Sequence, residues 1–559
     1  MQWPGCNPVS AELSSAGQCA RAVIAELISW GVRDIVLAPG SRSAPLAYEV
    51  FDADRTGQLR LHVRIDERTG AFLALGLAKA SARIVPVITT SGTAAANLHP
   101  AVLEASHSHL PLMVISADRP QSMINAGANQ TTQQDQLFGS HVRTSASLAD
   151  AAGNVRSWRF EVSRLAAAAA GIRTRLPGPV HLNVSFSEPL TPDLAEFSTP
   201  REPPAGAPNL PSSRPAEALR LGGDPATVVL VGDAPPDTGR AACEVAAMGG
   251  FPLLAEPSSN ARRGPEAISC YRMLLATELT ADIERVIVFG HPTLSRPVSR
   301  LLGRTDVEVV VVSDYADWVD PGLTARTVVD AVRANAPADY AWLERWCNAE
   351  RRLRPALDQL LDEQDVLTGQ AVARALWCKL TEQDTLVAGS SNPIRDLDLA
   401  PITSGPPIVH ANRGLSGIDG TLSTAIGIAL GAGRPTHALV GDLTFLHDIT
   451  ALMVGADEPR ADLRIVVAND GGGSIFATLE QGEPALASAF ERVFATPQQV
   501  DLAGLSAALG AGYALVGGPA ELGELISAAP HGIEVVEARI DRDRRRALDR
   551  AIQGLAGAM

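Results

Sequence analysis

The stretch HALVGDLTFLHDITALMVGADEPRADLRIVVANDGGG, residues 437–473, contains two apolar runs that each end in small and polar residues. Gly441-Asp442-Leu443 closes the first run and Asn469-Asp470-Gly471 closes the second, with 25 residues between the two triplets. A strand, a crossover helix and a second parallel strand need about this length. The spacing therefore predicts two adjacent parallel strands whose carboxyl ends bring Asp442 and Asn469 to one point.

Short β-branched runs alternate with longer Ala/Leu-rich stretches in three blocks of the chain, which is typical of βαβ units around parallel sheets. We expect strands at residues 34–38, 59–65, 84–90, 112–116, 180–184, 227–233, 285–290, 308–314, 385–392, 408–414, 437–442, 463–470 and 533–540. The predicted fold class is α/β, with three doubly wound parallel-sheet domains. Their expected bounds are residues 1–190, 224–345 and 346–559, with a Pro-rich linker at residues 191–223.

Composition limits the possible partners. The 559-residue chain has 46% hydrophobic and 19% charged residues and a net charge of −15, so we expect no nucleic-acid partner and no membrane insertion. The N-terminus shows no targeting signal and the six cysteines form no CxxC pair, which favours a cytoplasmic protein with reduced thiols. Small anionic substrates would need local arginines.

The two triplets suit a metal and a diphosphate. The Asp442 carboxylate, the Asn469 amide oxygen and the Gly471 carbonyl are the oxygen ligands that Mg²⁺ prefers. Glycines at 471, 472 and 473 would allow the backbone to approach phosphate closely. The simpler alternative is that GD and ND are two strand-end turns without a ligand.

The GDL and ND triplets at this spacing resemble the signature of thiamine-diphosphate enzymes, with Leu443 at a position usually held by Gly. The resemblance implies thiamine diphosphate and Mg²⁺ as cofactors, with Mn²⁺ as a substitute metal. It also implies pyrimidine-binding, central and diphosphate-binding domains in chain order, and a homodimer or dimer of dimers with active sites at the subunit interface. The implied cofactor-binding residues are Glu67, Ile418, Gly441, Asp442, Asn469, Gly471 and Gly472, of which Asp442, Asn469 and Gly471 hold the metal.

Nearly the whole chain resembles one family, the carboligases of menaquinone biosynthesis that use 2-oxoglutarate and isochorismate. The segments that carry this resemblance are residues 37–47, 116–120, 127–134, 390–396, 412–421 and 441–448. The implied reaction decarboxylates 2-oxoglutarate and adds the remaining unit to isochorismate in a Stetter-like 1,4-addition. Arginine forks suit the carboxylates of both substrates. The implied catalytic residues are Glu67, Ser391, Arg395 and Arg413, and the implied substrate-binding residues are Ser41, Arg42, Gln130, Arg296, Ile475 and Phe476.

Two alternatives stay open from the sequence. One is another thiamine-diphosphate-dependent decarboxylase or carboligase with a different acceptor. The other is a non-catalytic protein that binds thiamine diphosphate. A nucleotide site in the central domain is not expected, because TVVLVGDAPP at residues 227–236 begins like a dinucleotide-binding strand but no GxGxxG follows.

Overall fold

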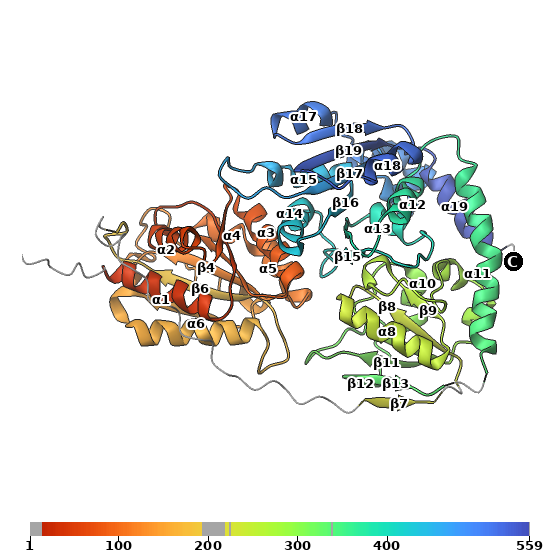
Figure 1. Cartoon of the computed structure of the whole chain (residues 1–559), viewed down its shortest axis with the longest axis horizontal. Coiled ribbons are helices and arrows are strands. Elements are labelled where there is room, and N and C mark those ends of the chain that lie inside the picture. Colours follow the sequence, from red (N-terminus) through yellow and green to blue (C-terminus); the bar gives the residue numbers. More distant parts are fainter. Residues whose placement is uncertain (1–13, 193–217, 223–224, 337–338, 558–559) are drawn as a thin grey trace, which may run out of the picture. The chain divides into compact units, whose positions relative to one another are not determined.

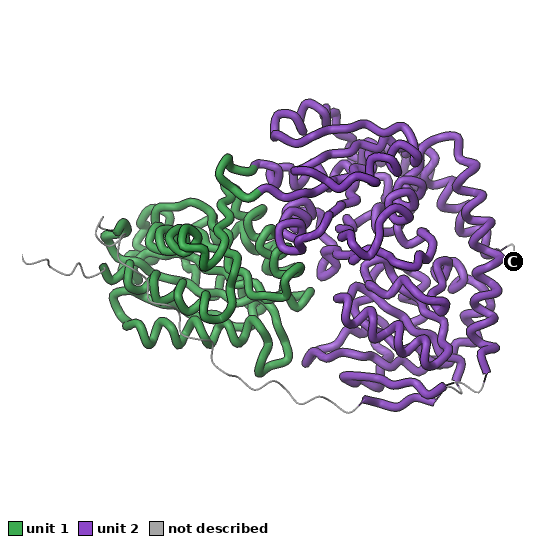
Figure 2. The backbone as a smooth tube through the Cα atoms, in the orientation of Figure 1, with its two compact units in different colours: residues 1–213, 454–459 green, residues 214–453, 460–559 purple. Residues whose placement is uncertain are grey.

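The computed structural model describes residues 14–192, 218–222, 225–336 and 339–557. The chain divides into two compact units, Met1–Ser213 with Val454–Pro459, and Arg214–Met453 with Arg460–Met559. Figure 2 colours these two units separately. Most of the predicted linker, residues 193–217 and 223, lies outside the described residues.

The first unit is built on a six-stranded sheet in the order β2-β1-β3-β4-β6-β5 (Figure 1). The strands are β1 Asp34–Leu37, β2 Arg60–Val63, β3 Val85–Thr89, β4 Leu112–Asp118, β5 Ser145–Ala149 and β6 Val180–Ser185. The helices are α1 Ser15–Ser29, α2 Ala44–Arg55, α3 Glu67–Ser81, α4 Thr93–Ala96, α5 His99–His107 and α6 Val155–Ala169. One core joins α1, α2 and α6 to one face of the sheet, while α3 packs on β1 and β3.

The second unit contains a five-stranded central sheet in the order β12-β11-β10-β8-β9 and a two-stranded sheet of β13 and β7. Their bounds are β7 Leu219–Leu221, β8 Thr227–Val231, β9 Leu253–Ala255, β10 Arg285–Phe289, β11 Glu308–Val312, β12 Thr327–Val329 and β13 Val332–Ala334. The helices of this part are α8 Pro236–Gly249 and the shorter α9 Tyr271–Leu274 and α10 Arg296–Leu302. Strand β7 falls in the last described part of the predicted linker.

The second unit also contains a six-stranded sheet in the order β15-β14-β16-β17-β19-β18. Its strands are β14 Thr385–Ala388, β15 Ile408–His410, β16 Thr436–Gly441, β17 Leu463–Asn469, β18 Gly512–Val516 and β19 Ile533–Arg539. The helices are α11 Ala341–Asp362, α12 Gly369–Lys379, α13 Asn392–Leu397, α14 Thr421–Ala432, α15 Asp442–His447, α16 Ala487–Phe490, α17 Leu502–Ala508, α18 Pro519–Ile526 and α19 Arg545–Gly557.

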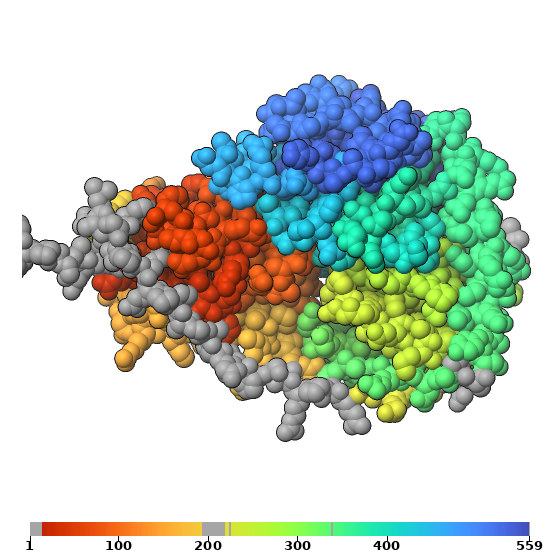
Figure 3. Space-filling model, in the orientation of Figure 1, coloured from red at the N-terminus to blue at the C-terminus, as the bar shows by residue number. Residues whose placement is uncertain are grey.

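The central part and the C-terminal part of this unit are in direct contact, as the yellow-green and teal surfaces show (Figure 3), and Asn260 of the central part bonds Val409 of β15. Leu548, Ile552 and Ala556 of the C-terminal helix α19 share a core with β8, β10 and α11. The boundary predicted between residues 345 and 346 lies inside α11, and the division into domains stays a prediction.

All strand pairs in the described sheets are parallel, so the predicted α/β class with parallel sheets is confirmed. Each predicted strand has an observed counterpart. The sequence did not reveal β5, β7, β9, β12, β13 or β18, because β5 and β18 are partly exposed edge strands and β7, β9, β12 and β13 are only three residues long. No helix in the described ranges has the length and apolar character needed to cross a membrane.

Candidate functional site

Asp442 and Asn469 lie at neighbouring strand ends, as their spacing predicts. Strands β16 and β17 pair in parallel with Gly441 opposite Ala468, so Asp442 and Asn469 each follow one of these paired residues. Asp442 is only 5% exposed and begins helix α15. Burial raises the pKa of its carboxyl to about 6, although backbone N–H groups of Leu443 and Gly472 oppose this rise.

The Asn469 amide is fixed by two hydrogen bonds. Its Nδ2 donates to Oε1 of Glu537 at 2.8 Å, and its Oδ1 accepts the Gly471 N–H at 3.1 Å. The neighbouring strand β19 supplies Glu537, whose carboxylate also accepts from Tyr513 and Arg539. This arrangement assigns the amide oxygen of Asn469 to the side of the glycine turn, with one lone pair still available.

The glycine turn requires residues without a side chain. Gly471 has φ +67° and Gly472 has φ +143°, and a Cβ on Gly472 would lie 2.4 Å from the Ala495 carbonyl oxygen. The Gly473 N–H donates to that same oxygen at 2.7 Å, which closes the turn. Backbone amides at this turn therefore stand next to the buried Asp442 carboxylate, to which the Gly472 N–H donates.

Asp470 is a site residue that the sequence analysis quoted but did not select. Burial, with a smaller contribution from the nearby Asp442 charge, raises the pKa of its carboxyl to about 7, although the hydrogen bond from Ser474 opposes the rise. One oxygen accepts from the Ser474 hydroxyl, while its Oδ1 is buried without a hydrogen-bond partner among the described residues. Only its position between two selected residues could have indicated it.

The buried Asp442 carboxylate and the half-buried Asp470 carboxylate repel each other, and the buried Oδ1 of Asp470 has no hydrogen-bond partner among the described residues. The pair fits a divalent cation, because a cation would offset the repulsion and bind the unpartnered oxygen. The predicted third ligand, the Gly471 carbonyl, accepts from Arg542 at 3.0 Å and retains a second lone pair. No group of three or more His, Cys, Asp or Glu side chains suitable for a metal is present in the described part of the chain. A metal here would depend on amide, carbonyl and phosphate oxygens as well.

The predicted residues Ser391 and Arg395 belong to the start of α13 and to the helix itself, which contacts this turn. Ser391, with φ +74°, precedes α13, and its carbonyl accepts from Nη1 of Arg395 at 2.7 Å. The adjacent Asn392 donates to the Ser474 hydroxyl at 2.7 Å, which links α13 to the turn.

Two predicted arginines lie close enough to perturb each other. Burial and the positive charges of Arg413 and Arg272 lower the pKa of Arg395. Arg413 is 4% exposed, and its guanidinium donates to the Thr293 hydroxyl. Neither Arg272 nor Thr293 could be selected from the sequence, since no motif marks them.

Three further predicted residues of this unit have weaker packing. Ile418, Ile475 and Phe476 are half-buried, and the Phe476 ring lies 5.7 Å from that of Phe494. Arg296 is exposed and forms an ion pair with Glu480 at 2.8 Å. Ser474, which directly follows the three glycines, is buried and bonded to Asn392 and Asp470.

In the first unit, Glu67 is the first residue of α3. Asp66 caps the helix, and Glu67 is left half-buried with its Oε2 accepting from Nδ2 of Asn97 at 3.2 Å. The glutamate is therefore not used as the cap of its own helix.

The predicted substrate residues Ser41, Arg42 and Gln130 belong to the same unit. Ser41 is exposed, while Arg42 donates to the Phe186 carbonyl at 2.9 Å, and burial and nearby Arg119 lower its pKa. Gln130, with φ +58°, bonds the Ser91 carbonyl, and its own carbonyl accepts from Arg119 at 3.0 Å. The sequence analysis assigned Arg119 no site role, and its position beside Arg42 and Gln130 was not visible in a motif.

Comparisons with known proteins show which family the chain belongs to. The family described as "Thiamine pyrophosphate enzyme, N-terminal TPP binding domain" matches residues 18–142, and "Thiamine pyrophosphate enzyme, C-terminal TPP binding domain" matches residues 399–538. The 2-succinyl-5-enolpyruvyl-6-hydroxy-3-cyclohexene-1-carboxylate synthase of Nocardioides sp. is 47% identical over 558 residues, covering 97% of this chain and 98% of its own. The enzyme of that name from Kineococcus radiotolerans is 47% identical over 540 residues, covering 94% and 96%.

The enzyme of the same name from Saccharopolyspora erythraea is 43% identical over 558 residues, covering 97% of this chain and 98% of its own. The chain thus belongs to the 2-succinyl-5-enolpyruvyl-6-hydroxy-3-cyclohexene-1-carboxylate synthase family, the thiamine-diphosphate-dependent transferases of menaquinone biosynthesis that its segments resemble.

Proposed function

We propose that the protein decarboxylates 2-oxoglutarate and adds the remaining four-carbon unit to isochorismate in a 1,4-addition, releasing CO₂ and 2-succinyl-5-enolpyruvyl-6-hydroxy-3-cyclohexene-1-carboxylate. The observation that carries the proposal is the glycine turn, where the buried Asp442 and the half-buried Asp470 stand beside backbone amides. Bound thiamine diphosphate supplies the nucleophilic carbon for such a reaction. The sequence relatives carry the name of an enzyme that makes this product.

The diphosphate end is proposed to use Gly441, Asp442, Asn469, Gly471 and Gly472, with Mg²⁺ on Asp442, Asn469 and Gly471, and with Mn²⁺ as a substitute. Support comes from the mutual repulsion of the Asp442 and Asp470 carboxylates, which a divalent cation would offset. Ile418 is proposed to hold the bent shape of the cofactor.

At the other end of the cofactor, Glu67 is proposed to hold a proton at N1′ of the aminopyrimidine ring. A carboxylate that is half-buried and not used as a helix cap supports this role. A carboxylate at that position favours the ring tautomer whose exocyclic nitrogen can accept a proton.

The anionic substrates are proposed to contact Ser391, Arg395 and Arg413, together with Ser41, Arg42, Gln130, Arg296, Ile475 and Phe476. Arg395 and Arg413 lie close together and are largely buried, which supports binding of carboxylates by these guanidinium groups. Arg296 is the least supported, because it is exposed and already paired with Glu480.

We also propose a cytoplasmic homodimer or dimer of dimers with active sites at the subunit interface, and domains at residues 1–190, 224–345 and 346–559. The family resemblance supports this assembly. Light scattering of the purified protein measures its mass directly, and a monomer that is active would contradict the shared site.

The function is tested with purified protein, thiamine diphosphate, Mg²⁺, 2-oxoglutarate and isochorismate, and the product is identified by mass. Isochorismate-dependent release of CO₂ together with the succinyl adduct supports the proposal. Release of CO₂ without the adduct would indicate a thiamine-diphosphate enzyme with another acceptor. No turnover, with cofactor still bound, would indicate a non-catalytic binding protein.

A further inference from the structure

Arg413 is held by a residue of the central segment. Its Nε and Nη2 both donate to the Thr293 hydroxyl oxygen, at 3.2 and 2.6 Å. Thr293 lies in the loop that follows β10, at the carboxyl edge of the central sheet. Two donors of one rigid guanidinium that meet a single acceptor restrict both the position and the plane of the group.

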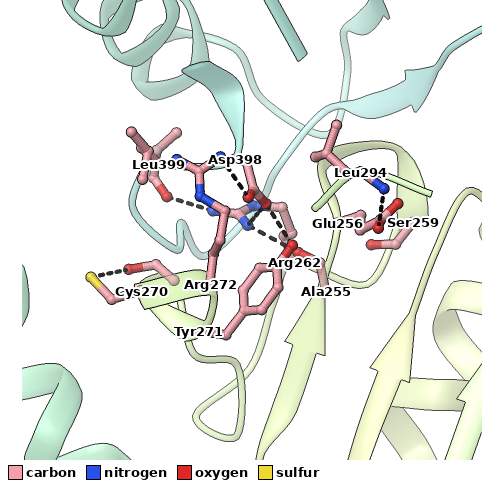
Figure 4. A network of polar contacts seen from close by, with 12 residues as sticks. Ala255, Glu256, Ser259, Arg262, Cys270, Tyr271, Arg272, Leu294, Asp398 and Leu399 are labelled. Atoms are coloured by element: carbon pink, nitrogen blue, oxygen red, sulfur yellow. Dashed lines mark hydrogen bonds and ion pairs between the residues drawn. The ribbon is translucent and has the colours of Figure 1, made fainter. Parts of the chain in front are cut away.

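The loop that carries Thr293 is itself held by Glu256, which directly follows β9. Glu256 is 1% exposed, and its Oε1 accepts the backbone N–H of Leu294 at 2.9 Å and that of Thr293 at 3.1 Å. Figure 4 shows the Glu256 carboxylate turned toward the Leu294 nitrogen. On its other side the loop pairs with the end of β8, since Asp233 and His291 exchange backbone hydrogen bonds of 3.1 and 2.9 Å.

The backbone that leads to Arg413 is held by the same edge of the central sheet. Asn260 donates to the Val409 carbonyl at 3.0 Å and accepts the Val409 N–H at 2.9 Å. Val409 belongs to β15, four residues before Arg413. The side chain and the approaching backbone of Arg413 are therefore both fixed by loops of the central sheet.

These contacts orient Arg413 without neutralising it. The buried carboxylate of Asp398 lies 3.8 Å from Arg262 and 3.4 Å from Arg272, and it accepts the Tyr271 hydroxyl (Figure 4). Arg413 instead bonds a neutral hydroxyl. Burial raises the pKa of Glu256 to about 8, which leaves this carboxyl largely uncharged at neutral pH.

We propose that Thr293 and Glu256 are positioning residues that aim the Arg413 guanidinium at a substrate carboxylate, an inference that rests on the proposed function. Thr293 acts on the guanidinium directly, and Glu256 acts through the loop of Thr293. The central sheet then contributes to the reaction through two residues that need not touch the substrate.

The test compares Thr293→Val, which keeps the shape but removes the hydroxyl, with Thr293→Ser, which keeps the hydroxyl. Ser299→Ala is the matched control, because that hydroxyl bonds only the Ser295 carbonyl of its own helix. A lost hydrogen bond to a charged group predicts a kcat/KM about 10- to 100-fold lower for at least one of the two carboxylate substrates in Thr293→Val. Thr293→Ser and Ser299→Ala should stay near wild type, and thiamine-diphosphate affinity should not change.

A double-mutant cycle separates positioning from general damage. If Thr293 acts through Arg413, Thr293→Val should add no loss in an Arg413→Ala background. An equal loss in both backgrounds, or none in either, would overturn the proposal.

The role of Glu256 is tested by two substitutions. Glu256→Leu should reproduce the Thr293→Val loss in kcat/KM, and Glu256→Gln should not. A folded Glu256→Leu enzyme with wild-type kcat/KM would show that Glu256 does not position Arg413.

Crystal structures of the holoenzyme variants keep this inference distinct from the proposed function. The Arg413 guanidinium should leave its observed position in Thr293→Val and keep it in Thr293→Ser, whichever substrate the enzyme uses. An unmoved guanidinium in Thr293→Val would refute the positioning role. A wild-type enzyme that ignores isochorismate would refute the proposed function instead.

Discussion

Glu256→Gln should make the stability of the second unit less dependent on pH. Both N–H groups that Glu256 accepts reach Oε1, so a glutamine can keep these bonds while it removes the ionisable group. Burial, with a smaller contribution from Asp398, raises the Glu256 pKa from its ordinary value of 4.5 to about 8, although Arg413 and the two N–H groups oppose the rise. The folded state therefore binds this proton more tightly than the unfolded state.

The sign and size of the effect on the free energy of unfolding follow from the linkage between proton binding and folding. A carboxyl whose pKa is raised in the folded state stabilises that state most below about pH 4.5, and this contribution falls as pH rises to about 8. At about 1.4 kcal/mol per unit, the loss between about pH 5.5 and pH 8 is on the order of 3 kcal/mol. An unfolding entropy of ~2.1 cal/mol/K per residue over roughly 340 residues converts this loss of free energy to a decrease of about 4 °C in the melting temperature.

The assay is the melting temperature of wild type and Glu256→Gln at both pH values, with exposed Glu278→Gln as the charge-matched control. The wild type and the control should lose about 4 °C more than Glu256→Gln on going from about pH 5.5 to pH 8. Equal changes in all three proteins would refute the argument, because they would mean that Glu256 ionises in the fold as it does in the unfolded chain.

Four further predictions concern the proposed site. Glu67→Gln should bind thiamine diphosphate with wild-type affinity in a fluorescence titration but lose at least about 100-fold in turnover, and normal turnover would exclude Glu67 from the reaction. Asp442→Ala should lose Mg²⁺-dependent cofactor binding by calorimetry, whereas unchanged binding would place the metal elsewhere. Gly472→Ala should weaken cofactor binding about 10-fold or more, because its Cβ meets a carbonyl oxygen at 2.4 Å, while Gly554→Ala, which meets nothing within 4 Å, serves as its control. Arg395→Ala should lower kcat/KM for a carboxylate substrate about 10-fold or more and leave cofactor affinity unchanged, and a loss of cofactor affinity would contradict its placement.

The sequence predicted the strands that end at the candidate site because these strands are buried on both faces. β16 and β17 read as continuous apolar runs, and their fixed parallel register brings Asp442 next to Asn469. The family resemblance is confirmed by relatives that cover nearly the whole chain. The roles of individual site residues stay predictions, since no ligand contact tests them.

The hydrogen-bond partners around the site could not be predicted in the same way. The role of Asp470 could not be predicted, because the chain turns at Gly471 directly after it. The position of its carboxylate depends on the Ser474 hydroxyl, which in turn accepts a hydrogen bond from Asn392. The partner of Asn469 is Glu537, 68 residues away on β19. Single-sequence patterns record periodicity and spacing, and neither specifies which distant side chain completes a hydrogen bond.

The central sheet shows where that limit matters most. It has no glycine-rich phosphate motif, and the sequence alone predicted no nucleotide site in this domain. Yet the loops after β8, β9 and β10 all meet at its carboxyl edge, which is the edge where parallel sheets generally bind ligands. Here Asn260 and Thr293 bond β15 and Arg413 of the neighbouring sheet in the place of a ligand, while Glu256 holds the loop of Thr293. A sheet edge suited to ligand binding can therefore serve to hold an arginine that we propose to bind substrate, and this use needs no sequence motif because ordinary side chains supply each contact.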